Sequence, residues 1–166
     1  MIKRSNIKLP ALLLALMFVL LPGCAETGTA EISEDVYAAA GDGQIVDIRD
    51  RYTADGELHG SDAGAPVQTL LLDNAEDNER VSSEALFEIS EDANTRLGIT
   101  ASWRQSGETL YVGVASAEGT IYALGLTSGA AHGTIDLSGL PAGEYAVTMF
   151  SSNDADVFAS LSYQIA

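Results

Sequence analysis

From residue 44 onward, the chain alternates apolar and polar residues with a period of two, and Gly, Ser, Asn and Asp clusters separate the alternating segments. Such a pattern predicts half-buried β-strands joined by turns, and the periodicity of a ten-residue helix is missing. Glu118-Gly119 is typical of a short hairpin turn. This alternation predicts strands over 67–72 and 120–126. It also predicts inward-facing sets, which are Val46/Ile48/Tyr52, Ala85/Phe87/Ile89, Ile99/Ala101/Trp103, Leu110/Val112/Val114, Ile135/Leu137, Tyr145/Val147/Met149 and Val157/Leu161/Tyr163/Ile165.

About eight strands at this spacing predict an all-β fold, and we expect residues 44–166 to form a single antiparallel β-sandwich of the jelly-roll or Ig-like type. A small closed β-barrel is the alternative. No change in composition along this stretch marks a second domain.

The N-terminus has a different pattern, in which the basic residues Lys3, Arg4 and Lys8 precede an apolar run over 9–22. That run is shorter than the roughly 20 residues of a membrane-spanning helix, and it ends in small residues, as a secretory signal does. Leu21-Pro22-Gly23-Cys24 closes it and resembles the lipobox of bacterial lipoproteins, although Pro22 departs from the usual residue at its position.

This resemblance implies a signal peptide over 1–23, cleavage between Gly23 and Cys24, and diacylglyceryl transfer to the Cys24 sulfur. Acyl chains such as palmitate would then anchor the mature chain to the cell membrane or the outer membrane, facing away from the cytoplasm. Residues 24–43 are acidic and poor in large apolar groups, so we expect a flexible lipidated tether spanning roughly 20 to 25 Å, with a short helix over 31–40 as an alternative.

The net charge narrows the range of partners. The full chain has a formal charge of −16. Removal of residues 1–23 reduces the eight basic residues to five and keeps all 24 acidic residues, which gives the mature chain a formal charge of −19. Such a surface repels nucleic-acid phosphates and anionic headgroups, so we expect membrane contact through the anchor alone and no nucleic-acid partner. Cys24 is the single cysteine, which leaves no intramolecular disulfide.

Residues 86–165 resemble the pre-peptidase C-terminal type of jelly-roll module found in secreted bacterial peptidases. The matching segments are Leu86-Phe87-Glu88-Ile89, Leu97 to Trp103, Thr109-Leu110-Tyr111-Val112 and Leu140-Pro141-Ala142-Gly143-Glu144-Tyr145. This resemblance implies a non-catalytic appendage. In the last segment Pro and Gly set the turn, and we expect Tyr145 to pack beneath it.

The inventory of catalytic side chains is small. A nucleophile triad needs a base, and the chain has only His59 and His132, each in a context typical of a solvent-exposed loop. Two histidines without a second cysteine do not favour zinc. Acidic pairs are numerous and could serve a hydrolase, which we keep as a minor alternative. We expect that the protein is not an enzyme and has no cofactor.

One acidic loop has oxygen donors of the kind that calcium prefers, which makes a structural calcium ion a possibility. A solvated hairpin loop is the alternative, because the spacing is not that of an EF-hand. The candidate ligands are Asp73, Asn74, Glu76, Asp77 and Glu79, with Asp154 and Asp156 as a second group of this type.

Tyr111 and Phe158 are the two aromatic residues that strand parity places away from the core. Each shares its face with small residues, which would leave a ring accessible for stacking on a sugar or another small ligand. A second buried face, or an edge covered by a loop, is the alternative for both. We therefore expect an envelope lipoprotein with a non-catalytic interaction or accessory module that binds an envelope or surface protein. A glycan-binding or small-ligand-binding module is the alternative.

Overall fold

The computed structural model describes residues 28–32, 44–54, 66–74, 80–104, 109–151 and 157–166, and these form strands almost throughout. Within these ranges the only helix is the single 3₁₀ turn η1 (Arg49–Arg51), and no helix has the length and apolar character needed to cross a bilayer. The strands are β1 (Thr29–Ala30), β2 (Ile45–Asp47), β3 (Tyr52–Ala54), β4 (Gln68–Asn74), β5 (Val81–Ser82), β6 (Phe87–Ile89), β7 (Arg96–Arg104), β8 (Leu110–Ser116), β9 (Ile121–Leu126), β10 (Ala130–Asp136), β11 (Gly143–Ser151) and β12 (Val157–Ile165).

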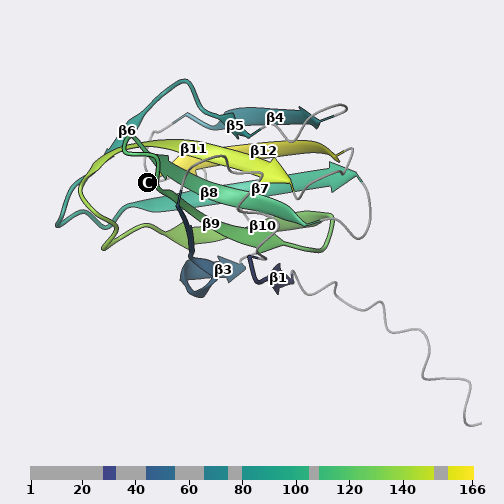
Figure 1. Cartoon of the computed structure of the whole chain (residues 1–166), viewed down its shortest axis with the longest axis horizontal. Helices are drawn as coiled ribbons and strands as arrows, with labels where there is room; N and C mark the ends of the chain where they lie inside the picture. The colour runs from purple at the N-terminus through teal and green to yellow at the C-terminus, as the bar shows by residue number, and fades with distance from the viewer. Residues whose placement is uncertain (1–27, 33–43, 55–65, 75–79, 105–108, 152–156) are drawn as a thin grey trace, which may run out of the picture.

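Two sheets pack face to face and do not close into a barrel (Figure 1). The first, sheet A, has the order β1-β9-β8-β11-β5, with β2 also paired to β9 and β6 to β11. The second, sheet B, has the order β3-β10-β7-β12-β4. Pairing is antiparallel except between β2 and β9. The predicted β-sandwich is confirmed, and the barrel alternative is wrong.

The core lies between the sheets and follows the predicted alternation. On β7 the residues Leu97, Ile99 and Ala101 point inward and are fully buried, or nearly so, while their neighbours are exposed or half-buried. Val112 and Val114 of β8 meet them from sheet A in the same cluster. Because each inward position removes apolar surface from water, this alternation is the main source of stability in a chain that has no disulfide.

The turn before β11 has the geometry predicted for the Leu140 to Tyr145 segment. The Tyr145 hydroxyl donates a hydrogen bond of 2.7 Å to the Pro141 carbonyl, and its ring is buried. Burial, and then the neighbouring Tyr122 and Glu118, raise the pKa of Tyr145, so the phenol stays a donor at neutral pH. Tyr145 therefore fixes this turn to the end of sheet A.

Asp136, at the end of β10, makes the stability of the chain around this turn depend on pH. The hydroxyl and the backbone N–H of Ser138 both donate to its carboxylate, and together with Arg96 and Arg51 they hold the pKa of Asp136 below its ordinary value of 3.8. A lowered pKa contributes stability at neutral pH that is lost as the pH falls below 3.8.

We expect Asp136→Asn to lower the free energy of unfolding at neutral pH by less than about 1 kcal/mol, because the carboxylate is exposed. The gap between wild type and variant should close in denaturant titrations below pH 3.8. Ser138→Ala, which removes the hydroxyl donor and keeps the carboxylate, is the companion variant and should converge with wild type over the same pH range. A gap that stays constant down to low pH would contradict the assignment.

Sheet A is also buried on its outer face. Tyr111 and Phe150 lie there with ring centroids 5.2 Å apart and planes 15° from parallel. They form a second cluster with Ile45, Ile121 and Ala123, against which Ile32 and Ala115 pack. The molecule thus has a main core between the sheets and a smaller apolar layer outside sheet A, where β2 and the residues after β1 meet it.

The segment that contains β1 is part of the sandwich. Thr29 and Ala30 pair with Leu126 and Gly125 of β9, and the Gly28 carbonyl accepts a hydrogen bond of 3.1 Å from the Thr127 N–H. The expectation of a flexible tether over 24–43 is therefore wrong for residues 28–32, and the domain does not begin at residue 44. Two-residue strands are decided by tertiary pairing, which local sequence does not reveal.

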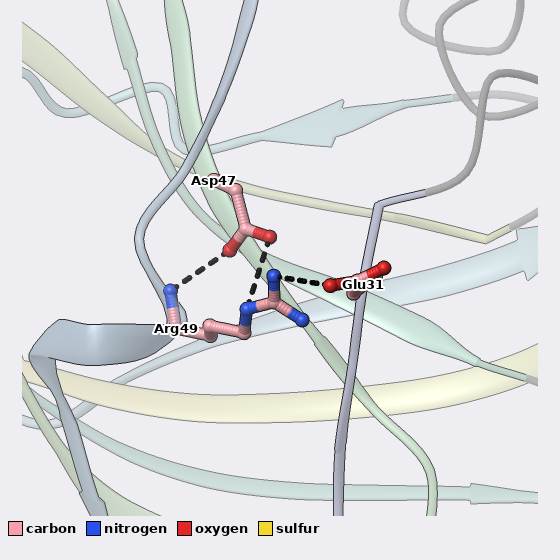
Figure 2. Close-up of polar contacts among 3 residues, drawn as sticks. All are labelled: Glu31, Asp47 and Arg49. Atoms are coloured by element: carbon pink, nitrogen blue, oxygen red, sulfur yellow. Dashed lines mark hydrogen bonds and ion pairs between the residues drawn. The ribbon is translucent and has the colours of Figure 1, made fainter.

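Arg49 links this segment to the start of the domain (Figure 2). Its guanidinium lies 2.9 Å from a Glu31 carboxylate oxygen and 3.4 Å from an Asp47 oxygen, and its backbone N–H donates to Asp47 over 2.9 Å. The hydrogen bond to Glu31, followed by the charges of the acidic neighbours, raises the pKa of Arg49, while its partial desolvation opposes this. The ion pairs are exposed, so they contribute little to the free energy of unfolding and mainly fix the position of the Arg49 side chain.

Candidate binding groove

A groove of about 460 Å³ lies on sheet B, where β4 and β7 end and β12 begins. Antiparallel pairing of β12 with both neighbours brings three outward side chains into one row, in which Phe158 lies between Asp73 and Arg104. The next row is Leu71, Ser160 and Ser102. Residues from three distant parts of the sequence therefore meet at one end of the sheet.

The groove exposes apolar surface beside polar groups. Phe158 is 48% exposed and Leu71 is 68% exposed, whereas the neighbouring inward residues Leu72, Trp103 and Ala159 are buried. These buried residues also line the groove, and they hold the strands that carry the exposed side chains. A half-exposed ring on a rigid strand can be covered by a ligand with little loss of side-chain entropy, because an aromatic side chain has only two rotatable bonds.

Two opposite charges flank the ring. Within the residues that the structure describes, no salt bridge is found to either Arg104 or Asp73. Ser102 and Ser160 add hydroxyl groups on the adjacent row. The groove therefore offers an apolar contact, a cation, an anion and hydroxyl groups, an arrangement suited to binding a ligand of mixed polarity.

The two aromatic residues that were expected to be accessible differ in their exposure. Phe158 is exposed, as predicted. Tyr111 is 3% exposed and stacks on Phe150, so the expectation that its ring is available to a ligand is wrong. Strand parity placed it correctly on the outer face of sheet A, but Ile32 and Ile45, from segments far away in the sequence, help to form the layer there.

The other predicted site residues are placed only in part. Asp73 is exposed on β4 beside Phe158, and Asn74 ends the same strand. Gly23 and Cys24, Glu76, Asp77 and Glu79 lie outside the described residues, as do His59, Asp154 and Asp156. Calcium binding by the 73–79 loop therefore stays a prediction. In the described part of the chain, no three side chains of His, Cys, Asp or Glu are grouped to hold a metal ion.

His132 lies on the same outer face as the groove, three strands away from its β4 edge. Its Nδ1 is 3.3 Å from the Thr100 hydroxyl, its neighbour on β7, and the ring is exposed. A serine or threonine nucleophile needs a base that is itself oriented by a third group, and Thr100 and His132 are two positions in a flat sheet surface. This contact is typical of a cross-strand polar pair.

Sequence reasoning missed Leu71 and Arg104 as groove residues. Leu71 stands between Leu70 and Leu72 in an unbroken apolar run, which conceals that its side chain points outward. The position of Arg104 beside Phe158 depends on the register between β7 and β12, which no local pattern encodes. Parity within the 67–72 segment is the signal that could have identified Leu71.

A second hollow of about 210 Å³ lies between the β8–β9 hairpin and the turn before β11. Tyr122 and Tyr145 line it together with Glu118 and Glu144. The Tyr145 hydroxyl is already used by Pro141, and the Ala117 N–H donates to the Glu144 carbonyl over 3.1 Å. These contacts hold two turns together, and we assign this hollow a structural role.

Comparison with known proteins returned no match, whether with family models, with curated proteins or with solved structures.

Proposed function

We propose that this protein is a cell-envelope lipoprotein whose β-sandwich is a non-catalytic interaction module, held at a membrane through Cys24 and recognising its partner at the Phe158 groove. The observation that carries the proposal is the exposed pair Phe158 and Leu71 on rigid strands, flanked by Arg104 and Asp73 without a salt bridge between them. Aromatic and arginine side chains are enriched at protein-binding surfaces, and Phe158 and Arg104 are cross-strand neighbours in this groove.

The lipobox at Leu21 to Cys24 and the preceding apolar run support the anchor. The position of β1 adds a constraint on distance. Four residues lie between Cys24 and Thr29, and the five Cα–Cα steps that join them extend at most about 18 Å. A sandwich so close to its anchor would work near the lipid surface, which suits an accessory subunit of an envelope complex. Its strongly acidic charge disfavours direct adsorption to anionic headgroups.

A photo-crosslinking amino acid at position 158 tests the groove on intact cells. The expected result is covalent capture of one protein in near-stoichiometric yield, identified by mass spectrometry. Amine-directed reagents would not report this contact, because both lysines lie in the predicted signal peptide. The matched control places the same probe at Leu86, which is exposed to 55% but lies outside the groove.

Equal capture from positions 158 and 86 would contradict a specific groove. Absence of any captured protein from position 158 would favour a second candidate, the binding of a glycan. The half-exposed Phe158 ring beside the hydroxyl groups of Ser102 and Ser160 supports this candidate, since rings stack on sugar faces while hydroxyls and charges orient the sugar. Glycan titration of wild type against Phe158→Ala is then the decisive experiment.

A further inference from the structure

Strand β4 is an open edge of sheet B. It pairs with β12 on one side, and among the described residues no strand pairs with its other side. In Figure 1 it lies at the upper margin of the molecule. Natural edge strands are usually short, or protected by lysine, proline or a bulge, because unpaired N–H and C=O groups invite another strand. Over its seven residues, Gln68–Asn74, β4 has no lysine, arginine or proline.

The side chains of β4 make this edge apolar as well as unpaired. Leu71 points outward and is 68% exposed, and Val67, directly before the strand, is 54% exposed. Leu70 and Leu72 point into the core from the same strand. A strand added here would therefore extend both the sheet and the apolar layer beneath it.

The sequence of β4 is nearly symmetric about Leu71. Read outward from Leu71, it gives Leu70 and Leu72, then Thr69 and Asp73, then Gln68 and Asn74. In an antiparallel pair centred on Leu71, each of these residues would face its counterpart in an identical strand. Leucine would meet leucine, and the Thr69 hydroxyl could donate to the Asp73 carboxylate.

We propose that a second copy of this chain pairs with β4, so that two antiparallel β4 strands related by a two-fold axis at Leu71 join the two B sheets into one continuous sheet. Such a contact is isologous and closes on itself, which limits assembly to a dimer. The axis is perpendicular to the sheet, and so both Phe158 grooves lie on the same face.

The net charge of the two copies opposes their association, so the proposed dimer is not driven by charge. Each copy is strongly acidic, and long-range repulsion opposes the dimer. Asp73 is the one acidic residue of β4, and the proposed register places it opposite Thr69 instead of another carboxylate. Added salt screens the repulsion and leaves the backbone pairing intact, so the dimer should strengthen as ionic strength rises.

Cysteine crosslinking on intact cells tests the register. In Leu71→Cys the two thiols face each other with Cβ atoms about 5 Å apart, near the separation that a disulfide needs. We expect a mild oxidant, copper phenanthroline, to convert most of this variant to a covalent dimer. In Val67→Cys, a control that is also more than half exposed, the thiols lie about 26 Å apart in the same register and should not crosslink.

A second pair of variants tests the same geometry independently. Thr69→Cys and Asp73→Cys, carried on two differently tagged copies, should crosslink to each other but not to themselves. Wild type, whose single cysteine is Cys24, is treated in parallel so that any Cys24 crosslink is recognised. In the full chain purified in detergent, Leu71→Lys should weaken the dimer at least about tenfold, because it opposes two like charges across the pair.

Three results would overturn the proposal. The first is that Leu71→Cys forms no covalent dimer although a maleimide probe labels its thiol. The second is that Val67→Cys crosslinks as readily as Leu71→Cys, which is the result expected for random collision. The third is that wild type sediments as a monomer in detergent at both low and high salt.

Discussion

Tyr111→Ala should lower the free energy of unfolding by about 3 to 5 kcal/mol, as truncation of a buried aromatic side chain generally does. The ring is buried on the outer face of sheet A and stacks on Phe150 with 5.2 Å between centroids. Removal of the ring leaves a cavity beside Phe150 and takes support from the second apolar layer. Equilibrium denaturation in urea measures the change.

Phe158→Ala is the matched control, because it truncates an aromatic side chain on the exposed outer face of the other sheet. We expect its stability to stay within about 1 kcal/mol of wild type, as is usual for surface substitutions. Strand parity alone suggests the same role for both residues, whereas the structure gives them different ones: Tyr111 would serve stability and Phe158 would serve binding. Equal stability of the two variants would contradict this assignment.

Cys24→Ser should release the protein from the membrane fraction almost completely. The binding free energies of the acyl methylenes add up, since each buried methylene contributes about 0.8 kcal/mol to membrane binding and a lipoprotein anchor has two or three chains. Electrostatic adsorption to anionic headgroups would not compensate, because the residues after Gly23 include five basic side chains against 24 acidic ones. Fractionation of cells after a high-salt wash measures the change.

Ala25→Ser is the control for this experiment, because it alters the neighbouring position and keeps the sulfur that would accept the lipid. It should remain with the membranes. If Cys24→Ser also remains there after the salt wash, then Cys24 is not the anchor. A Cys24→Ser protein that stays in the membrane through an uncleaved signal peptide can be recognised by its larger size, since the precursor keeps its 23 N-terminal residues.

The long strands could be predicted from the sequence because each follows the alternation over many residues. The predicted inward sets of β7, β8, β11 and β12 are all buried, or nearly so. Strands β1 and β5 have two residues each, too few for any period, and only their partners β9 and β11 determine them. Ala85 was expected to face inward and is exposed, because β6 begins only at Phe87.

The candidate groove could be predicted only one residue at a time. Parity and small neighbours indicated that Phe158 was accessible, and the oxygen-rich loop indicated Asp73. That these two side chains are cross-strand neighbours depends on the register of β12 against β4, which is set by packing across the whole sheet. The sequence pattern thus identified two residues of the groove, but only the tertiary structure shows that they lie side by side.

The wide separation of paired strands along the chain has a consequence for biogenesis. Tyr52 donates a hydrogen bond to a residue 80 positions away, and Thr69 lies beside Ser162, 93 positions away. Sheet B remains incomplete until β12 is delivered between β7 and β4. Contacts of such high order form slowly. The leucine side chains of β4 would therefore stay exposed during folding until the last strand arrives, and the chain would be most prone to aggregate in that interval.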